Sequence, residues 1–484
     1  MNKTKLTKRV LLSIMALAGA GAVLYLLWSN GSFLPRWIDW GDKTLSAESG
    51  TYEIQLKNKH VTVLYEASPI WHSPEQVLVQ DILSVDIDDD STEELILLCW
   101  KIGRYGTHRP FWVEKDERKW SQHIFVYEYT GEALRPKWMS SYIGLDVAHM
   151  SEGKRSAIPT RRLLLTAPDG ALSSWIWNSW GFTGEDTDIT FTVFGDNLIH
   201  EPIYRYGLHH DEDFCFLFES FRDILRQTDI AVLNQETPLT GNPLQYSGYP
   251  RFATPVNVGQ AIVDAGFDVV TCATNHALDL GADGVHFTKE FFASHDVLCL
   301  GIQSAEEPDD CPYRILVRNG IRFALLNYTY GTNGMKLPEE TPYMVHLLTD
   351  EAKVRTDIAK ARADADFVIL FVHWGTEYAA QPDDFQKTWA QIFLDSKADV
   401  VVGTHPHTLQ PYELLTDEDG HEMLIYYSIG NFISAQNEQS CIKGGMASFT
   451  VSLTPDGYRV TEYSLQPLTI TAHGGGKYTT DLVR

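Results

Sequence analysis

The sequence has few cysteines and no closely spaced pair of them. Its six cysteines are scattered over 484 residues without a CxxC pair or finger-like spacing, so neither a structural zinc site nor a redox motif is predicted. Cys272 and Cys299 lie in apolar runs, and we expect them to be buried thiols. A large core does not need disulfide bonds, so we expect no essential disulfide.

Positive charge is also scarce. The chain has 39 Lys and Arg residues against 64 Asp and Glu residues, which gives a formal net charge of −25. Such a surface repels polyanions, which argues against nucleic acid as a partner. Hydrophobic residues make up 44% of the chain, as in ordinary globular proteins. The length exceeds what one core usually organises, so we expect two folded domains and an accessory segment.

One long uncharged apolar run lies near the N-terminus, from Val10 to Trp28. A helix of this length can cross a hydrocarbon core of ~30 Å. Because basic residues precede the run, we predict a cytoplasmic tail over residues 1–9, a single-pass transmembrane helix over 10–28 and extracellular domains after it. A cleavable signal peptide is the alternative, since the run is rich in alanine.

The region after this run is predicted to be rich in β-strands. Residues 29–49 mix Trp, Pro, Gly and charge without periodicity, which is typical of a linker. Over residues 50–185, apolar and polar residues alternate in short runs, with turn signals at Lys57-Asn58-Lys59 and Asp169-Gly170. We interpret residues 50–185 as a mostly β accessory domain that contains two hairpins at these turns.

An acidic loop within this region is a candidate calcium site. Asp86, Asp88 and Asp90 alternate in a tight loop, and Glu94 follows four residues later. Calcium prefers such hard oxygen ligands. The loop resembles the DxDxDGxxEL loop of FG-GAP or VCBS repeats, although Ser91 replaces the usual Gly and one copy is evident. A solvated acidic turn between strands is the alternative.

The pattern changes at Ile189. Apolar strands alternate with longer amphipathic segments over residues 189–470, which predicts an α/β domain with a buried sheet, followed by a tail over 471–484. Each strand is followed at once by polar residues. This placement favours a site, because α/β domains build their sites beyond the carboxyl ends of the strands.

Five of these loops contain candidate metal ligands. The candidates are Asp196, Glu236, Asn275, His373, His405 and His407. Two carboxylates, one amide oxygen and three imidazoles suit a dinuclear site for divalent ions of the Mn, Fe or Zn class, with one bridging carboxylate. Any one of them alone could be a capping or core residue. Their shared position at strand ends favours a metal site.

Six ordered blocks resemble the capsule-synthesis family of the CapA/PgsA type, which is related to calcineurin-like metallophosphoesterases. The blocks are GDNLIH, NQETPLT, TCATNHALDLGADG, VHWGTEY, VVGTHPHTLQPYE and YYSIGNFIS, within residues 189–468. The resemblance implies a four-layer α/β/β/α fold and a two-metal site. It also implies a role in making or exporting poly-γ-glutamate or a related anionic surface polymer.

The resemblance implies a role for each candidate. Asp196 would bind the first ion, Glu236 would bridge, and Asn275 with His373 would bind the second. His405 and His407 would complete the site, one for each ion. His276, next to Asn275, would be the general acid that protonates a leaving oxygen.

One position departs from the pattern of the phosphoesterases. They usually have a histidine two residues after the first aspartate, where this chain has Leu198, with His200 farther on. His200 either replaces that ligand or packs at the start of a helix. Glu377 and Tyr378 either line the pocket or belong to the ordinary surface.

These observations leave three functional hypotheses. The first is a metallophosphoesterase-like, metal-dependent hydrolase outside the membrane, acting on a cell-surface anionic polymer or its precursor with other capsule-synthesis proteins. The second is a noncatalytic scaffold of a capsule synthesis or export complex. The third is a surface-binding module whose β region recognises the polymer.

Overall fold

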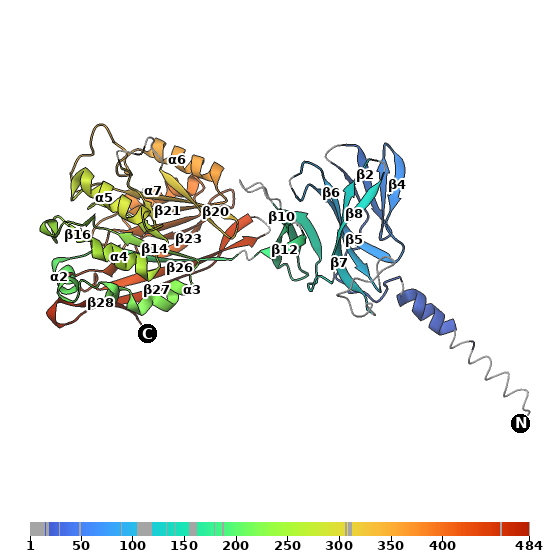
Figure 1. Ribbon diagram of the computed structural model, residues 1–484, viewed down its shortest axis with the longest axis horizontal. Coiled ribbons are helices and arrows are strands. Elements are labelled where there is room, and N and C mark those ends of the chain that lie inside the picture. Colours follow the sequence, from blue (N-terminus) through green and yellow to red (C-terminus); the bar gives the residue numbers. More distant parts are fainter. Residues whose placement is uncertain are drawn as a thin grey trace, which may run out of the picture. The chain divides into compact units, whose positions relative to one another are not determined.

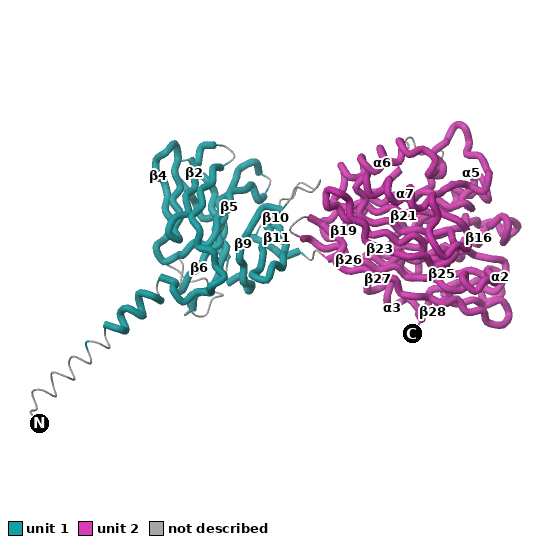
Figure 2. Tube along the Cα trace, turned by 180° about the vertical axis from the view of Figure 1, so that it is seen from behind, with its two compact units in different colours: residues 1–155, 159–186 teal, residues 156–158, 187–484 magenta. Residues whose placement is uncertain are grey.

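The computed structural model divides the chain into two compact units, which we describe separately (Figure 2). Unit 1 comprises Met1–Arg155 and Pro159–Asp186, and unit 2 comprises Ser156–Ile158 and Thr187–Arg484. The structure describes residues 15, 19–28, 30–47, 50–88, 90–103, 119–131, 133–140, 142–153, 162–178, 180–185, 188–304, 307, 312–454 and 457–483.

The N-terminal run is described only in part. Residues 19–28 are helical, while the predicted basic tail 1–9 and most of 10–18 lie outside the described residues. Within the portion of the chain that is described, no helix combines the length and the apolar character needed to cross a membrane.

The described residues of unit 1 form three antiparallel four-stranded sheets; Figure 1 shows strands of this unit. The strands are β1 (Lys43–Ser46), β2 (Tyr52–Lys57), β3 (His60–Tyr65), β4 (Ser68–His72), β5 (Val77–Val85), β6 (Glu94–Lys101), β7 (Ser121–Tyr129), β8 (Leu134–Met139), β9 (His149–Glu152), β10 (Arg162–Thr166), β11 (Leu172–Asn178) and β12 (Gly181–Glu185).

Both predicted hairpins of unit 1 are confirmed. Strands β2 and β3 pair around Asn58 and Lys59, whose φ angles of 49° and 66° are those of a two-residue hairpin turn. Strands β10 and β11 pair around the Asp169-Gly170 turn. Strand β1 lies inside the segment that we interpreted as a linker, because its backbone pairs with β2 from Lys43 to Ser46.

Unit 2 contains two large sheets and six α-helices among its described residues. The strands of the first sheet are β13 (Ile189–Asn197), β14 (Ile230–Gln235), β17 (Val269–Thr271), β18 (Leu298–Leu300), β25 (Asn431–Ile433), β26 (Lys443–Thr454), β27 (Gly457–Ala472) and β28 (Tyr478–Leu482). Those of the second are β19 (Tyr313–Arg318), β20 (Ile321–Thr329), β21 (Phe367–His373), β22 (Val400–Thr404), β23 (Tyr412–Thr416) and β24 (Glu422–Tyr426).

The remaining elements of unit 2 lie between these strands in the chain. They are α2 (Glu201–His209), α3 (Arg222–Gln227), α4 (Val256–Ala265), α5 (Gly281–Ala293), α6 (Glu351–Asp364), α7 (Asp384–Asp395) and the short paired strands β15 (Leu239–Thr240) and β16 (Thr254–Pro255). Strand β28 lies in the predicted tail and extends the first sheet, because it pairs with β27 from Leu468 to Ala472.

The two sheets of unit 2 share one core. Phe191 of β13, Phe323 of β20 and Ile369 of β21 belong to the same buried cluster, which contains residues of both sheets. The alternate residues of β21, such as Leu370, belong to a second cluster with α6 and α7, while α4 and α5 contribute to a third with the first sheet. A strand buried on both faces is typical of a parallel sheet covered by helices. The predicted mixed α/β class is confirmed.

A β-bulge positions the first candidate ligand. The register of β13 against β14 shifts between Phe194 and Asp196. At this point the Asp196 N–H donates to Gly430 O at 3.0 Å, and a Cβ atom on Gly195 would lie 1.8 Å from the same oxygen. Only glycine permits this close approach of two backbones. Bulges of this kind often aim a side chain into an active site.

Candidate metal centre

The six predicted ligands come from the carboxyl ends of strands in both sheets of unit 2. Asp196 lies in β13 and His373 ends β21. Glu236, Asn275 and the two remaining histidines follow β14, β17 and β22. Strands β13, β14 and β17 are parallel neighbours in one sheet, and β21 and β22 in the other. Parallel strands end at the same edge, which brings these side chains together.

Asp196 is fully buried, and it contacts Asn234 as well as the loop that carries His405 and His407. Its Oδ1 accepts a hydrogen bond from Asn234 Nδ2 at 2.8 Å. Its Oδ2 lies 3.1 Å from His407 Nδ1 and 3.3 Å from the His405 backbone nitrogen. Asn234 is itself oriented by Thr271 Oγ1, which donates to Asn234 Oδ1 at 2.8 Å. The carboxylate is therefore fixed in position before any ion binds.

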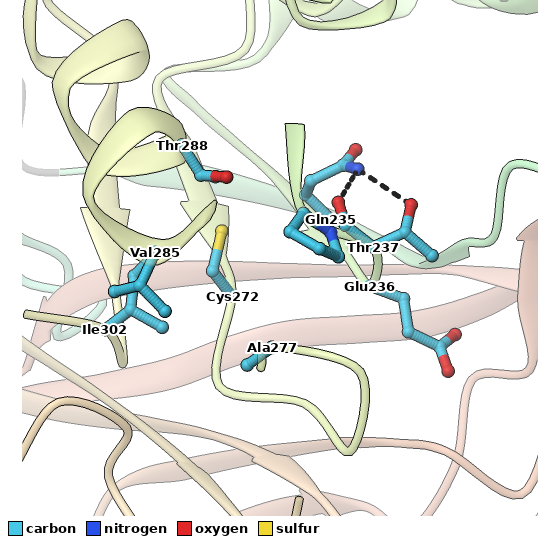
Figure 3. A pocket seen from close by; sticks show the side chains of 9 residues that line it. Gln235, Glu236, Thr237, Cys272, Ala277, Val285, Thr288 and Ile302 are labelled. Carbon is cyan, nitrogen blue, oxygen red and sulfur yellow. Dashed lines mark hydrogen bonds between the residues drawn. The ribbon is translucent and has the colours of Figure 1, made fainter. Parts of the chain in front are cut away.

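Glu236 is the most unusual group of the cluster. It is buried, and neither of its carboxylate oxygens has a hydrogen-bond partner among the described residues. Figure 3 shows its carboxylate pointing away from Cys272 and the other labelled side chains of a small cavity. The preceding residue, Gln235, has a partner of its own, because its Nε2 donates to Thr237 O at 2.6 Å. A buried carboxylate without partners is costly unless a cation compensates it.

His373 and Asn275 face each other beside Glu236. His373 Nε2 lies 2.9 Å from Asn275 Oδ1 and 3.7 Å from Glu236 Oε1. The other ring nitrogen, Nδ1, pairs with Thr404 Oγ1 at 3.0 Å. A second partner of this kind fixes the orientation of an imidazole and leaves Nε2 for a ligand.

His405 and His407 are held in an uncommon backbone conformation. Their φ angles are 95° and 58°, in the left-handed region that residues other than glycine seldom adopt. Both side chains are buried, and His405 Nδ1 has no partner among the described residues. Such strained residues persist where the surrounding structure determines them, and they cluster at functional sites.

The pKa values of these residues reflect their burial and mutual contact. Burial, and then the charge of Asp196, raises the pKa of Glu236 well above its ordinary value. Burial lowers the pKa of His373 and of His405 well below the usual range, and neighbouring imidazoles act in the same direction. Burial also lowers the pKa of His407, but Glu236 and Asp196 outweigh it and raise that pKa to about 9. In this balance of burial and charge, His407 is the imidazole whose protonated form the neighbouring carboxylates favour.

This balance predicts how pH affects the metal-free protein. Because the pKa of His407 rises on folding from about 6.5 to about 9, its contribution to stability is present below pH ~6.5 and is lost as pH rises toward ~9. We expect the free energy of unfolding to fall over this window by on the order of 3 kcal/mol from His407. Thermal unfolding of the metal-stripped chain should show this fall, and His407→Gln should reduce it; an identical fall in the variant would contradict the assignment.

His276 lies beside the cluster and is paired with a carboxylate. Its Nδ1 is 2.7 Å from Oδ2 of Asp279, which is buried and also accepts from the Phe252 N–H. The rings of Phe252 and His276 pack edge to face, with centroids 4.8 Å apart. Among the described residues, His276 belongs to neither group of unit 2 side chains that could hold an ion. A histidine with one ring nitrogen held by a carboxylate suits proton transfer, and the role of His276 as general acid stays a prediction.

His200 is not brought into either of those groups. It caps the start of α2, and its Nδ1 lies 3.2 Å from Leu198 O and 3.3 Å from the Ala435 nitrogen. Burial lowers the pKa of His200 to about 4, with smaller contributions from His407 and His276. In this structure its contacts are those of a residue packed at the start of a helix, which was the second of the two predicted alternatives.

The acidic loop of unit 1 gathers only part of its predicted ligand set. Asp86, Asp88 and Asp90 offer oxygens within 4.8 Å of one another. Glu94 is absent from that group, because its carboxylate accepts from the Ile87 N–H at 3.0 Å and pairs with Lys137 Nζ at 2.5 Å. Lys137 also pairs with Asp88 at 2.7 Å. A cation supplied by β8 therefore already neutralises part of this loop.

Asp279 and Asn333 were not assigned to the site from the sequence, whereas Glu377 was given as either pocket lining or ordinary surface. Asp279 holds the ring of His276 in position. Its place three residues after the histidine in the sequence could have indicated this contact. The end of β20 was not counted among the strand ends, yet Asn333, which follows it, accepts from Asn275 Nδ2 at 3.3 Å. Asn431 Oδ1 lies 3.0 Å from His407 Nδ1. Glu377 lies near His405 and His407, with ligand atoms within 4.8 Å of one another.

Comparison with known proteins identifies the family. Residues 190–436 match the sequence profile described as bacterial capsule synthesis protein PGA_cap. The chain belongs to this family. It is 31% identical over 259 residues to the PGA biosynthesis protein CapA of Bacillus subtilis (strain 168), and 28% identical over 264 residues to the capsule biosynthesis protein CapA of Bacillus anthracis. Each match covers 52% of this chain, and they cover 65% and 61% of the relatives. The PGA_cap chain thus spans less than two thirds of those relatives.

Solved structures are more distant. The calcineurin-like phosphoesterase YfkN of Bacillus subtilis is 15% identical with a TM-score of 0.35, covering 58% of this chain and 90% of its own. The NAD nucleotidase NadN of Haemophilus influenzae is 12% identical with a TM-score of 0.37, covering 60% of this chain and 53% of its own. These scores are low, so the account of the PGA_cap chain rests on its own sheets and side chains.

Proposed function

We propose that unit 2 is a metal-dependent, phosphoesterase-like hydrolase that acts in the assembly of a capsular polymer. Membership of the PGA_cap family supports the pathway, since two relatives are named for PGA or capsule biosynthesis. One observation supports the chemistry most: buried Glu236 has no hydrogen-bond partner among the described residues, yet it forms with Asp196 and His407 a group of ligand atoms within 4.8 Å of one another.

The donor set fits divalent metal ions. Asp196, Glu236 and His407 would hold one ion, and Asn275, His373 and His405 would surround a second beside Glu236. Oxygen and imidazole donors in this mixture suit the Mn, Fe or Zn class. Ions at these positions would supply Lewis-acid chemistry to a phosphoryl or acyl oxygen.

The chain's own residues supply the proton. Asp279 accepts at His276 Nδ1, which leaves Nε2 of that ring to donate toward a leaving oxygen. Phe252 packs against the same ring and excludes water from one side of it. Thr404 and Asn333 orient His373 and Asn275, so that the cluster keeps its arrangement before substrate binds.

The substrate and the location of the protein are part of this proposal. We propose an anionic surface polymer such as poly-γ-glutamate, or its precursor, as substrate, and other capsule-synthesis proteins as partners. Basic residues before the apolar run of residues 10–28 support a membrane anchor with unit 2 outside the cell. A noncatalytic scaffold is the alternative, and apolar Leu198 at a usual ligand position favours it.

Hydrolysis by the full-length chain tests the proposal. The metal-stripped protein and the same protein reloaded with Mn²⁺ would be assayed on phosphomonoesters, phosphodiesters and γ-glutamyl polymers. We expect turnover of at least one substrate class that disappears on chelation and returns with metal. A protein that binds metal but turns over none of them would favour the scaffold.

A further inference from the structure

Leu198 leaves one ion of the proposed centre short of a ligand. This residue stands two positions after Asp196, and its side chain is buried. Its N–H donates to Ile433 O at 3.0 Å, which fixes an apolar side chain where the resemblance predicts a histidine. Because His200 belongs to no described group of candidate ligands, another part of the chain is the better source of a replacement ligand.

Glu377 is the candidate on the open side of the centre. Its carboxylate, His405 and His407 offer ligand atoms that lie within 4.8 Å of one another. The two histidines are buried, whereas Glu377 is exposed. His405 Nδ1 is buried and has no hydrogen-bond partner among the described residues. Buried polar atoms normally have a partner, and a metal ion at this position would provide one. Oxygen and imidazole atoms at this spacing need only a small contraction for Glu377 to join His407 on the ion that lacks the histidine, beside His405.

The backbone holds Glu377 next to the two histidines. The N–H of Tyr378 donates to Pro406 O at 2.8 Å, and Pro406 lies between His405 and His407. Thr408 Oγ1 also donates to Ala379 O at 3.0 Å. The loop after β21 is thereby tied to the loop after β22 at the two residues directly after Glu377, so the fold sets the position of Glu377.

The other end of the same loop is tied to α7. Thr376 Oγ1 donates to Asp383 Oδ2 at 2.7 Å, and Asp383 caps α7 in a reciprocal box with Gln386. A Cβ atom on Gly375, whose φ is 91°, would lie 2.6 Å from the Gln386 side chain. Few alternative conformations are open to a loop held at both ends, which keeps the exposed carboxylate near the centre.

We propose that Glu377 is a metal ligand on the solvent side of the centre, acting with His405 and His407 and compensating for Leu198. This inference rests on the proposed metal-dependent function, and it adds a ligand from a different loop. The Glu377 carboxylate also places negative charge where the ion meets solvent and substrate.

Calorimetric titration of the metal-stripped full-length chain with Mn²⁺ tests this role. We expect Glu377→Gln to weaken Mn²⁺ binding by at least about 10-fold, the lower end of the effect of removing a group that supports a metal site. Glu377→Asp should retain part of the affinity. Glu340→Gln, which alters another exposed glutamate of unit 2, should bind Mn²⁺ as the unaltered chain does.

The outcomes separate this inference from the proposed function. If the unaltered chain binds Mn²⁺ and Glu377→Gln binds it with the same affinity and stoichiometry, the role of Glu377 is overturned while the metal centre stands. If the unaltered chain binds no divalent ion, the proposed function fails and this inference fails with it. Unfolding of the metal-free variants should be unchanged, because Glu377 is exposed and its substitution by Gln preserves its shape.

Discussion

Replacing Glu236 with Gln is expected to abolish tight metal binding without unfolding the protein. The carboxylate is buried beside Asp196, and neither of its oxygens has a hydrogen-bond partner among the described residues. An amide removes the charge that both ions would share. We expect metal affinity to fall by more than about 100-fold, beyond the usual effect of groups that only support a ligand. Activity should disappear at the same metal concentrations.

The stability of the metal-free variant should change little. Burial beside Asp196 disfavours the charged form of Glu236 when no ion is present, whereas the same charge is the first of the groups that raise the pKa of His407. Because Glu236→Gln removes both effects, which oppose each other, we expect the free energy of unfolding of the metal-free form to change by no more than about 1 kcal/mol. Denaturant unfolding of stripped samples and elemental analysis of loaded samples measure the two effects, with Glu340→Gln as control. Unchanged metal content together with lower stability would make Glu236 an ordinary structural residue.

Replacing His276 with Ala is expected to separate catalysis from metal binding. His276 Nδ1 is engaged by Asp279 at 2.7 Å, and His276 belongs to neither ligand group of unit 2 among the described residues. If its role is to donate a proton, metal content should be retained while kcat falls by roughly 10²–10⁴-fold, the usual contribution of general acid catalysis. The loss should be smaller for a substrate with a good leaving group, which needs less protonation.

Asp279→Asn is the matched variant for His276. It removes the charge that orients the imidazole but leaves the ring in place, so we expect a smaller loss of kcat with unchanged metal content. Steady-state kinetics and elemental analysis on both variants give the comparison. A loss of metal from His276→Ala would contradict the proton-transfer role and would make His276 a ligand.

The sequence predicted the parts of the site that depend on local pattern. Apolar runs followed at once by polar residues marked the strand ends, and parallel strands bring such ends together, so Asp196 and His373 meet as expected. The turn residues Asn58 and Lys59 likewise predicted a hairpin that the structure confirms.

Contacts that depend on distant pairing were not predictable in this way. Strands β1 and β28 have weak patterns of their own and exist because neighbouring strands offer them a backbone edge. Lys137 reaches the acidic loop only because β8 lies beside it in the folded unit. For Glu377 the sequence left pocket lining and ordinary surface open, and the hydrogen bond from Tyr378 to Pro406 holds it beside His405 and His407.

Anomalous diffraction from crystals of the full-length chain grown with Mn²⁺ is the most direct measurement of the central claim. The account predicts a strong anomalous peak among Asp196, Glu236 and His407, with a second beside His373 and His405. The Glu236 carboxylate should lie between them. Crystals that contain Mn²⁺ elsewhere but show no peak at these residues, with Glu236 still unpartnered, would contradict the claim that this cluster is a metal centre.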